Sequence, residues 1–170
     1  MLKVRQNVGV SAAGDFIDAA LQNEGSWYRA ADAREQFGNA LQFYGSSVGA
    51  IRGTVRDALK KFPGMDHDQV TALASELWTI PSYERRRAAV VLLQTNARML
   101  VSSDLTRLEG FVRSAALREL VDPLTLDVIQ PLLAQLPAAS RTRADLILER
   151  WSNDPSELVR HAAELCRLPN

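Results

Sequence analysis

Apolar residues recur three and four positions apart along almost the whole of this 170-residue chain. One such stripe contains Val48, Ile51, Val55, Ala58 and Leu59. This spacing gathers apolar side chains on one face of an α-helix, because an α-helix turns by about 100° per residue. No segment shows the sustained two-residue alternation that is typical of a strand. The sequence therefore predicts an all-α protein without a sheet.

Three further stripes have the same helical spacing. They contain Leu105, Leu108, Phe111, Val112 and Ala115; Leu124, Val128, Ile129, Leu132 and Leu136; and Ala144, Ile147, Leu148 and Trp151. Residues 62–64, 80–82 and 154–157 form short breaks in the helical pattern, and each break contains a proline. In the last of them, Asp154 and Pro155 followed by Glu157 are typical of a helix start. Connections this short make neighbouring helices antiparallel.

A segment from Trp78 to Ala89 is echoed by the segment from Trp151 to Ala163, with one residue inserted. The two segments lie about two repeats apart if the repeat is a helix pair of about 40 residues. A helix pair cannot bury its apolar face alone, so such pairs stack and form an extended concave surface. We therefore expect a single domain over residues 1–170, an α-solenoid (α-α superhelix) of antiparallel HEAT-like helix pairs.

The two echoed segments also place residues at equivalent positions for which we expect a role in packing. Trp78 and Trp151 stand at helix ends, where a large aromatic side chain packs between helices. Arg86 and Arg160 hold equivalent places and face the core, so we expect them to form ion pairs between repeats.

The composition is that of an ordinary globular protein, with 46% hydrophobic and 24% charged residues. Cys166 is the only cysteine, and His67 and His161 are the only histidines, so we expect no metal site and no cofactor. No apolar run approaches the roughly 20 residues that span a bilayer, and nothing near the start is typical of a signal peptide. We therefore expect a cytoplasmic protein with no membrane partner.

The formal net charge is zero, so the composition alone does not indicate a nucleic-acid-binding protein. The charges are nevertheless unevenly distributed. Between residues 52 and 61, Arg52, Arg56, Lys60 and Lys61 are opposed only by Asp57, and residues 84–118 contain seven arginines and three acids. Two interpretations stay open: a solvated charged surface, or a positive band along one side of the protein.

Several of these segments also resemble a known family. The matching residues are Phe43-Tyr44-Gly45 with Val48, Ile51 and Arg52; Leu77-Trp78 with Glu84, Arg86, Ala88 and Ala89; Leu120-Val121-Asp122; and Trp151 with Arg160, His161, Ala162 and Ala163. In their order and spacing they resemble the DNA alkylation repair (AlkD-like) family of HEAT-repeat proteins, over roughly residues 43–170.

The resemblance implies a solenoid that cradles duplex DNA and a glycosylase that excises positively charged alkylated purines without a metal or redox cofactor. A cationic base already weakens its glycosidic bond, and its departure leaves positive charge on the sugar. A carboxylate stabilises that charge, and aromatic faces attract the cation. Asp122 falls where the family places its carboxylate, so the resemblance implies that Asp122 is the catalytic residue.

The sequence departs from the family pattern in two places. Arg118 stands four residues before Asp122, where the family has a tryptophan. The resemblance also ends one or two helix pairs early, so we expect the last groove wall and its aromatic residue to be missing. The alternative function is a catalytically inactive HEAT-like scaffold that binds the DNA backbone or a protein partner.

Individual residues keep alternative interpretations. Asp122 precedes Pro123 and is equally well explained as the N-cap of a helix. Arg118, one turn earlier, is expected to pair with Asp122, with a phosphate contact as the alternative. The predicted contacts to DNA are Arg52, Lys60, Arg85, Arg87, Arg118 and His161.

Overall fold

The computed structural model describes the backbone of residues 2–169 and the side chains of residues 12–169. These residues form helices joined by short loops, and no strand occurs in the described part of the chain. An isolated bridge between Gln42 and Ser82 is the one β-type contact there. The predicted fold class, all-α with HEAT-like antiparallel helix pairs, is therefore confirmed. The chain divides into two compact units, residues 1–95 and 96–170.

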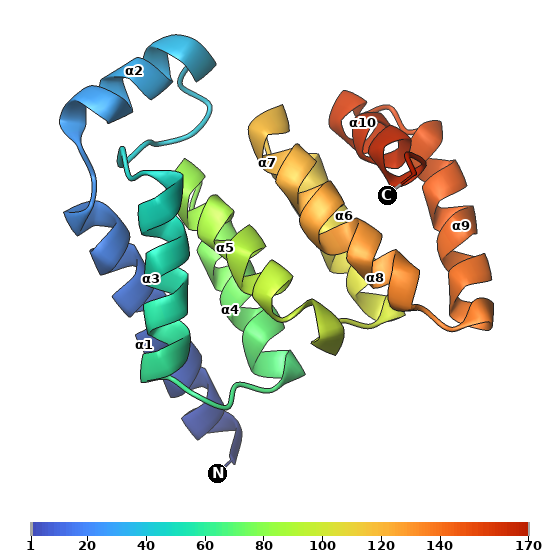
Figure 1. Cartoon of the computed structure of the whole chain (residues 1–170), viewed down its shortest axis with the longest axis horizontal. Helices are drawn as coiled ribbons and strands as arrows, with labels where there is room; N and C mark the ends of the chain where they lie inside the picture. Colours follow the sequence, from blue (N-terminus) through green and yellow to red (C-terminus); the bar gives the residue numbers. More distant parts are fainter. Residues whose placement is uncertain (1, 170) are drawn as a thin grey trace. The chain divides into compact units, whose positions relative to one another are not determined.

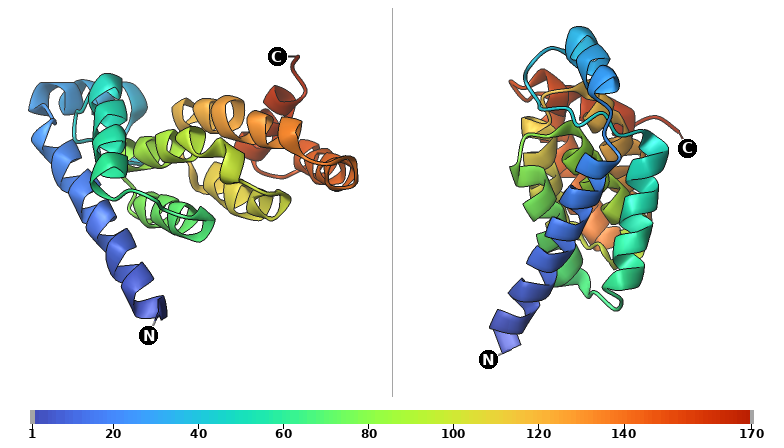
Figure 2. Two further views of the ribbon diagram at one scale, coloured as in Figure 1. Left: turned by 60° about the horizontal axis from the view of Figure 1, so that its bottom comes forward. Right: turned by 90° about the vertical axis from the view of Figure 1, so that its left-hand side faces the viewer.

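The described helices of the first unit are α1 (Leu2–Asn23), α2 (Trp27–Phe37), α3 (Val48–Lys61), α4 (His67–Thr79) and α5 (Tyr83–Thr95). Helices α1 and α4 run in one direction and α3 and α5 in the other, and these four pack against one another (Figure 1). Their core includes Ile17, Leu21, Ile51, Val55, Leu73, Leu77, Leu92 and Leu93. Helix α2 lies at one end of the bundle and has Ala30 as its buried residue (Figure 2).

The stripe predicted for α3 is confirmed in its central part. Ile51, Val55 and Ala58 are buried, as the three-four spacing requires. Val48 is exposed because it is the first residue of the helix, beyond the end of the core. The hydroxyl of Ser47 accepts a hydrogen bond from the backbone N–H of Ala50 and so caps the start of α3.

A buried carboxylate connects the loop before α3 to the start of α5. The side chain of Glu84 accepts hydrogen bonds from the backbone N–H of Tyr44 (3.0 Å) and of Gly45 (2.8 Å). A buried charge is costly unless such bonds replace its water, and charge-assisted hydrogen bonds of this length are strong. The loop that leads into α3 is therefore fixed to the first turn of α5.

Gly45 is held in a conformation and a space that only glycine fits. Its φ is +83°, and a Cβ there would lie 2.1 Å from the carbonyl oxygen of Ser26. Gly64 has a similar φ of +74° but has open space around the position of a Cβ. A side chain at Gly64 would suffer only from the left-handed backbone, whereas one at Gly45 would also suffer from close packing. Comparing substitutions at the two positions therefore separates the two energetic costs.

We expect Gly45→Ala to lower the free energy of unfolding by about 3 kcal/mol, because backbone strain and the clash with the Ser26 carbonyl add. Gly64→Ala is the matched control and should lower it by only about 1 kcal/mol, because strain acts there alone. Urea unfolding followed by circular dichroism measures both. Equal losses in the two variants would contradict the close approach at Gly45.

The second unit consists of two 3₁₀ turns followed by longer helical segments. Its described elements are η1 (Ala97–Met99), η2 (Ser102–Asp104), α6 (Leu105–Ser114), α7 (Arg118–Leu124), a π-helical turn η3 (Thr125–Ile129), α8 (Gln130–Gln135), α9 (Ala138–Ser152) and α10 (Glu157–Cys166). Segments α7, η3 and α8 are continuous and form one helical run. Buried residues of the predicted stripes, among them Leu108, Val112, Val128 and Leu148, form the core.

The π-helical turn has a cause in the spacing of the buried residues. From Leu120 to Leu133 two rows of buried residues recur every four positions: Leu120, Leu124, Val128 and Leu132, and Val121, Thr125, Ile129 and Leu133. Four residues of α-helix turn by about 400°, which is about 40° more than one full turn. Over three such steps the excess rotation adds up to about 120°. The wider π-helical turn removes part of this rotation, so both rows stay in the core.

The two echoed segments are structurally similar in part. Trp78 and Trp151 are both buried, which confirms that they pack between helices. Arg86 donates from Nε to the carbonyl of Trp78 (3.1 Å), with its guanidinium over the Trp78 ring. Arg160 donates to the carbonyls of Asp154 (2.6 Å) and Pro155 (2.9 Å). Each arginine therefore donates to a backbone carbonyl of the segment that precedes its own helix. For Arg160 these bonds stand in place of the predicted ion pair between repeats.

Candidate functional site

A basic groove lies between α3 and α5. Arg52, Arg56 and Lys60 are four residues apart, so they lie along one face of α3, and all three are exposed. Together with Leu59 and with Val91, Gln94 and Thr95 of α5 they line a hollow of about 480 Å³. Two predicted DNA contacts, Arg52 and Lys60, are thus brought together. We call this hollow, lined by these seven residues, the α3–α5 groove.

The charge of the α3–α5 groove is positive. None of the described residues that line it is acidic. Arg56 pairs with Asp57, whose carboxylate is 3.4 Å from Nε of Arg56 in an exposed contact. Exposed pairs of this kind are weak, so the three cations attract an anion that enters the groove. Arg56 was not among the predicted DNA contacts, although its four-residue spacing from Arg52 and Lys60 would have identified it.

In the second unit, the structure brings Asp122 and His161 together. Oδ1 of Asp122, on α7, is 2.6 Å from Nε2 of His161, on α10. The side chain of Asp122 is 48% exposed and that of His161 is 17% exposed. Asp122 lies inside the continuous run of α7, η3 and α8, so its interpretation as a helix N-cap is wrong. The helix begins four residues earlier, at Arg118, and the backbone of Leu117, directly before it, is extended.

A second polar contact joins the same two helices one turn away. Arg118 of α7 pairs with Glu157 of α10, so the predicted pairing of Arg118 with Asp122 is wrong. The residues of both contacts are four apart on each helix, at 118 and 122 and at 157 and 161. Residues four apart lie on the same helix face, so the two contacts are neighbours. We call this arrangement the α7–α10 ladder: Arg118–Glu157 and Asp122–His161.

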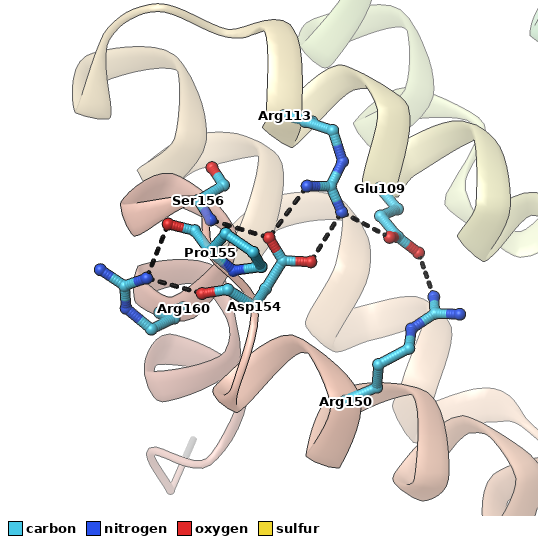
Figure 3. Close-up of polar contacts among 7 residues, drawn as sticks. All are labelled: Glu109, Arg113, Arg150, Asp154, Pro155, Ser156 and Arg160. Atoms are coloured by element: carbon cyan, nitrogen blue, oxygen red, sulfur yellow. Dashed lines mark hydrogen bonds and ion pairs between the residues drawn. The ribbon is translucent and has the colours of Figure 1, made fainter.

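A network of ion pairs holds the start of α10 against α6 (Figure 3). Arg113 donates from Nη1 and Nη2 to the two carboxylate oxygens of Asp154, at 2.9 and 2.8 Å. Nη2 of Arg113 also donates to Glu109 (2.9 Å), whose second oxygen accepts from Arg150 (2.5 Å). Asp154 also accepts from the backbone N–H of Ser156 (2.8 Å), directly before α10 begins. The network therefore positions the helix that carries His161.

These bonds change the ionisation of the network. The hydrogen bonds from Arg113, and then the one from the Ser156 N–H, lower the pKa of Asp154 from 3.8 to about 2. The same carboxylates, Asp154 first and Glu109 second, raise the pKa of Arg113. A lowered carboxyl pKa means that the ionised form stabilises the folded state above the ordinary carboxyl pKa. That stability is lost as the pH falls through the window from about 4 to 2.

We expect Asp154→Asn to lower the melting temperature by a constant amount above about pH 4, because the wild-type carboxylate is then ionised and paired. Below that pH the difference from wild type should shrink toward pH 2, as the wild-type carboxyl gains its proton. Thermal melts at several pH values measure this difference. Arg113→Gln should show the same window, and a difference that grows as the pH falls would contradict the assignment.

The two remaining predicted DNA contacts lie on α5, which is surrounded by other helices. Arg85 is 5% exposed, with Nη1 2.8 Å from Oδ1 of Asp18 and Nη2 3.2 Å from the Glu76 carbonyl. Burial of Asp18 opposes its ionisation, but the bonds from Arg85 and Tyr44 outweigh it and lower the pKa of Asp18. Arg87 is half-buried and also interacts with neighbouring groups. A phosphate would have to break the Arg85–Asp18 pair to reach Arg85, so this geometry favours a packing role.

Other kinds of site find little support in the described residues. No three histidine, cysteine, aspartate or glutamate side chains among them are gathered closely enough to hold a metal ion. Burial raises the pKa of the Cys166 thiol to about 12, which suits a packed side chain. No helix of the described chain combines the length and the apolar character that a membrane span requires.

A comparison with known protein families gives a match. A family model described as "DNA alkylation repair enzyme" matches residues 17–169. The match begins at residue 17, earlier than the start near residue 43 that the motifs indicated, and it includes part of α1 and all later helices. No curated protein matches the chain.

Proposed function

The chain belongs to the DNA alkylation repair family, and on this basis we propose that it binds duplex DNA through phosphate contacts in the α3–α5 groove. The observation that supports this proposal is the row of Arg52, Arg56 and Lys60 in a hollow without a lining acid. Four residues of α-helix span about 6 Å, so the three cations extend over about 12 Å along α3. Such a row suits a backbone that carries one charge on every nucleotide.

The chemistry of the groove also suits phosphate. Arginine presents a planar fork of N–H donors that matches phosphate oxygens, and lysine adds a compact positive charge. Leu59 and Val91 contribute apolar surface to the groove. Apolar surroundings weaken the screening of a charge pair by water, which strengthens the attraction. These contacts read the backbone and carry no base sequence by themselves.

We expect the double variant Arg52→Gln, Lys60→Gln to bind duplex DNA more weakly for every sequence tested. Loss of two phosphate contacts should also reduce the slope of log affinity against log salt by about 1.8. Fluorescence anisotropy with labelled duplexes at several salt concentrations measures both effects. The matched control is Arg34→Gln with Arg143→Gln, which removes two exposed arginines from other helices. If the control weakened binding as much, the groove would not be the site.

We further propose that the chain releases positively charged alkylated purines, with Asp122 as the charge-stabilising carboxylate. The observation that favours this is that Asp122 is half-exposed. Its Oδ1 binds His161, and its Oδ2 forms no hydrogen bond with any described residue. A cationic base takes the bonding electron pair of its glycosidic bond and leaves as a neutral molecule. An ionised carboxylate then stabilises the positive charge that develops on the sugar.

We expect wild type to release 7-methylguanine or 3-methyladenine from alkylated duplex DNA, and Asp122→Asn to release it at least about 100-fold more slowly. Asparagine keeps the size of the side chain but removes its charge. Asp127→Asn, five residues later on the π-helical turn, is the matched control and should keep the wild-type rate. Chromatography of the released base gives the rates. Tight DNA binding with no base release from wild type would leave the alternative, an inactive DNA-binding member of the family.

A further inference from the structure

The contact with Asp122 fixes which nitrogen of His161 carries the proton. An ionised carboxylate only accepts hydrogen bonds, so Nε2 of His161, 2.6 Å from Oδ1, must be the N–H donor. In the neutral imidazole the other nitrogen, Nδ1, then holds an unshared electron pair. Among the residues with described side chains, Asp122 is the one that forms a hydrogen bond with this imidazole. Nδ1 is therefore available to accept a proton.

We propose that His161 is the general base of the base-release reaction, a role that rests on the proposed excision of alkylated purines. When the glycosidic bond breaks, its electron pair goes to the cationic base, which leaves neutral. A water molecule forms the new C–O bond at the sugar C1′ and gives one proton to Nδ1 of His161. The imidazole becomes a cation that the Asp122 carboxylate stabilises through the Nε2–H bond, as in hydrolases with an Asp–His pair.

The two oxygens of Asp122 allow both of its roles at once. Oδ1 holds His161 in the required tautomer and orientation, and Oδ2 remains for the positive charge on the sugar. The imidazole is mostly buried and Asp122 is half-exposed, so the pair combines a fixed base with an accessible carboxylate. The two groups lie on separate helices, and their separation is set by the packing of α7 against α10.

The second rung of the α7–α10 ladder supports this packing. Arg118 pairs with Glu157 one turn away, and the Arg113–Asp154 ion pair positions the start of α10. The charged groups on the elements packed against α10 are Arg107, Glu109 and Arg113 on α6; Arg118, Glu119 and Asp122 on α7; Asp127 on η3; and Arg141, Arg143, Asp145, Glu149 and Arg150 on α9. Of these, Asp122 alone forms a hydrogen bond with the imidazole in the described structure.

The test is the pH dependence of base release under single-turnover conditions. Because the base must be neutral, the wild-type rate should rise with pH and then level off. His161→Gln keeps a side-chain N–H that can donate to Asp122 but has no basic nitrogen. We expect this variant to lose the rise and to release base about 10²–10⁴-fold more slowly at the plateau.

Glu164→Gln is the matched control, because it removes a charge from an exposed position on the same helix. It should keep the wild-type pH profile. If His161→Gln keeps both the rate and the rise, the role of His161 is wrong while base excision stands. If wild type releases no base at any pH, base excision itself is overturned, and the role of His161 with it.

A measurement without activity also tests the tautomer. The chain has two histidines, so ¹⁵N NMR of the imidazole nitrogens needs only one variant for assignment. In the neutral form we expect Nε2 of His161 to carry the proton and Nδ1 to be unprotonated. A neutral His161 that carries its proton on Nδ1 would overturn the proposal even if the variant failed to fold.

Discussion

The buried carboxylate of Glu84 holds the loop that leads into α3, because it binds two consecutive backbone N–H groups of that loop. Gly45 allows the loop to pass close to Ser26, which brings these N–H groups within reach. The cationic face of α3 thus depends on a carboxylate that itself never reaches solvent. In the family motifs, the matching glycine and glutamate look like separate signatures, yet here they form a single contact between distant parts of the chain.

The two compact units contribute different chemistry. The first carries a groove with three cations and no lining acid, which suits a polyanion. The second carries a half-exposed carboxylate with an imidazole, which suits hydrolysis of a cationic leaving group. A net charge of zero is compatible with both, because the cations of the groove are not cancelled locally. Total charge was therefore a poor guide to function, and local arrangement is the better one.

Helical spacing predicted the fold because each buried stripe follows from the residues of one helix alone. It predicted the burial of Ile51, Val55 and Leu148, and also the packing of Trp78 and Trp151. Side-chain contacts between different helices could not be predicted from the spacing within one helix. Arg118 and Asp122 are one turn apart, so local spacing favoured their pairing, but both found partners 39 residues away on α10. Arg85 looked like a free cation because sequence shows no sign of Asp18, its partner on another helix.

The π-helical turn of residues 125–129 has a consequence for chain length. It lies between Pro123 and Pro131, neither of which supplies a backbone N–H to the helix. A π-helical turn holds one residue more than an α-helical turn, so removing one residue between these prolines would let it close to an α-helix. Leu132 and Leu133 would then still face the interior, because the lost residue removes about 100° of the excess rotation. An inserted residue would instead add about 100°, so natural variation here should tolerate a deletion better than an insertion.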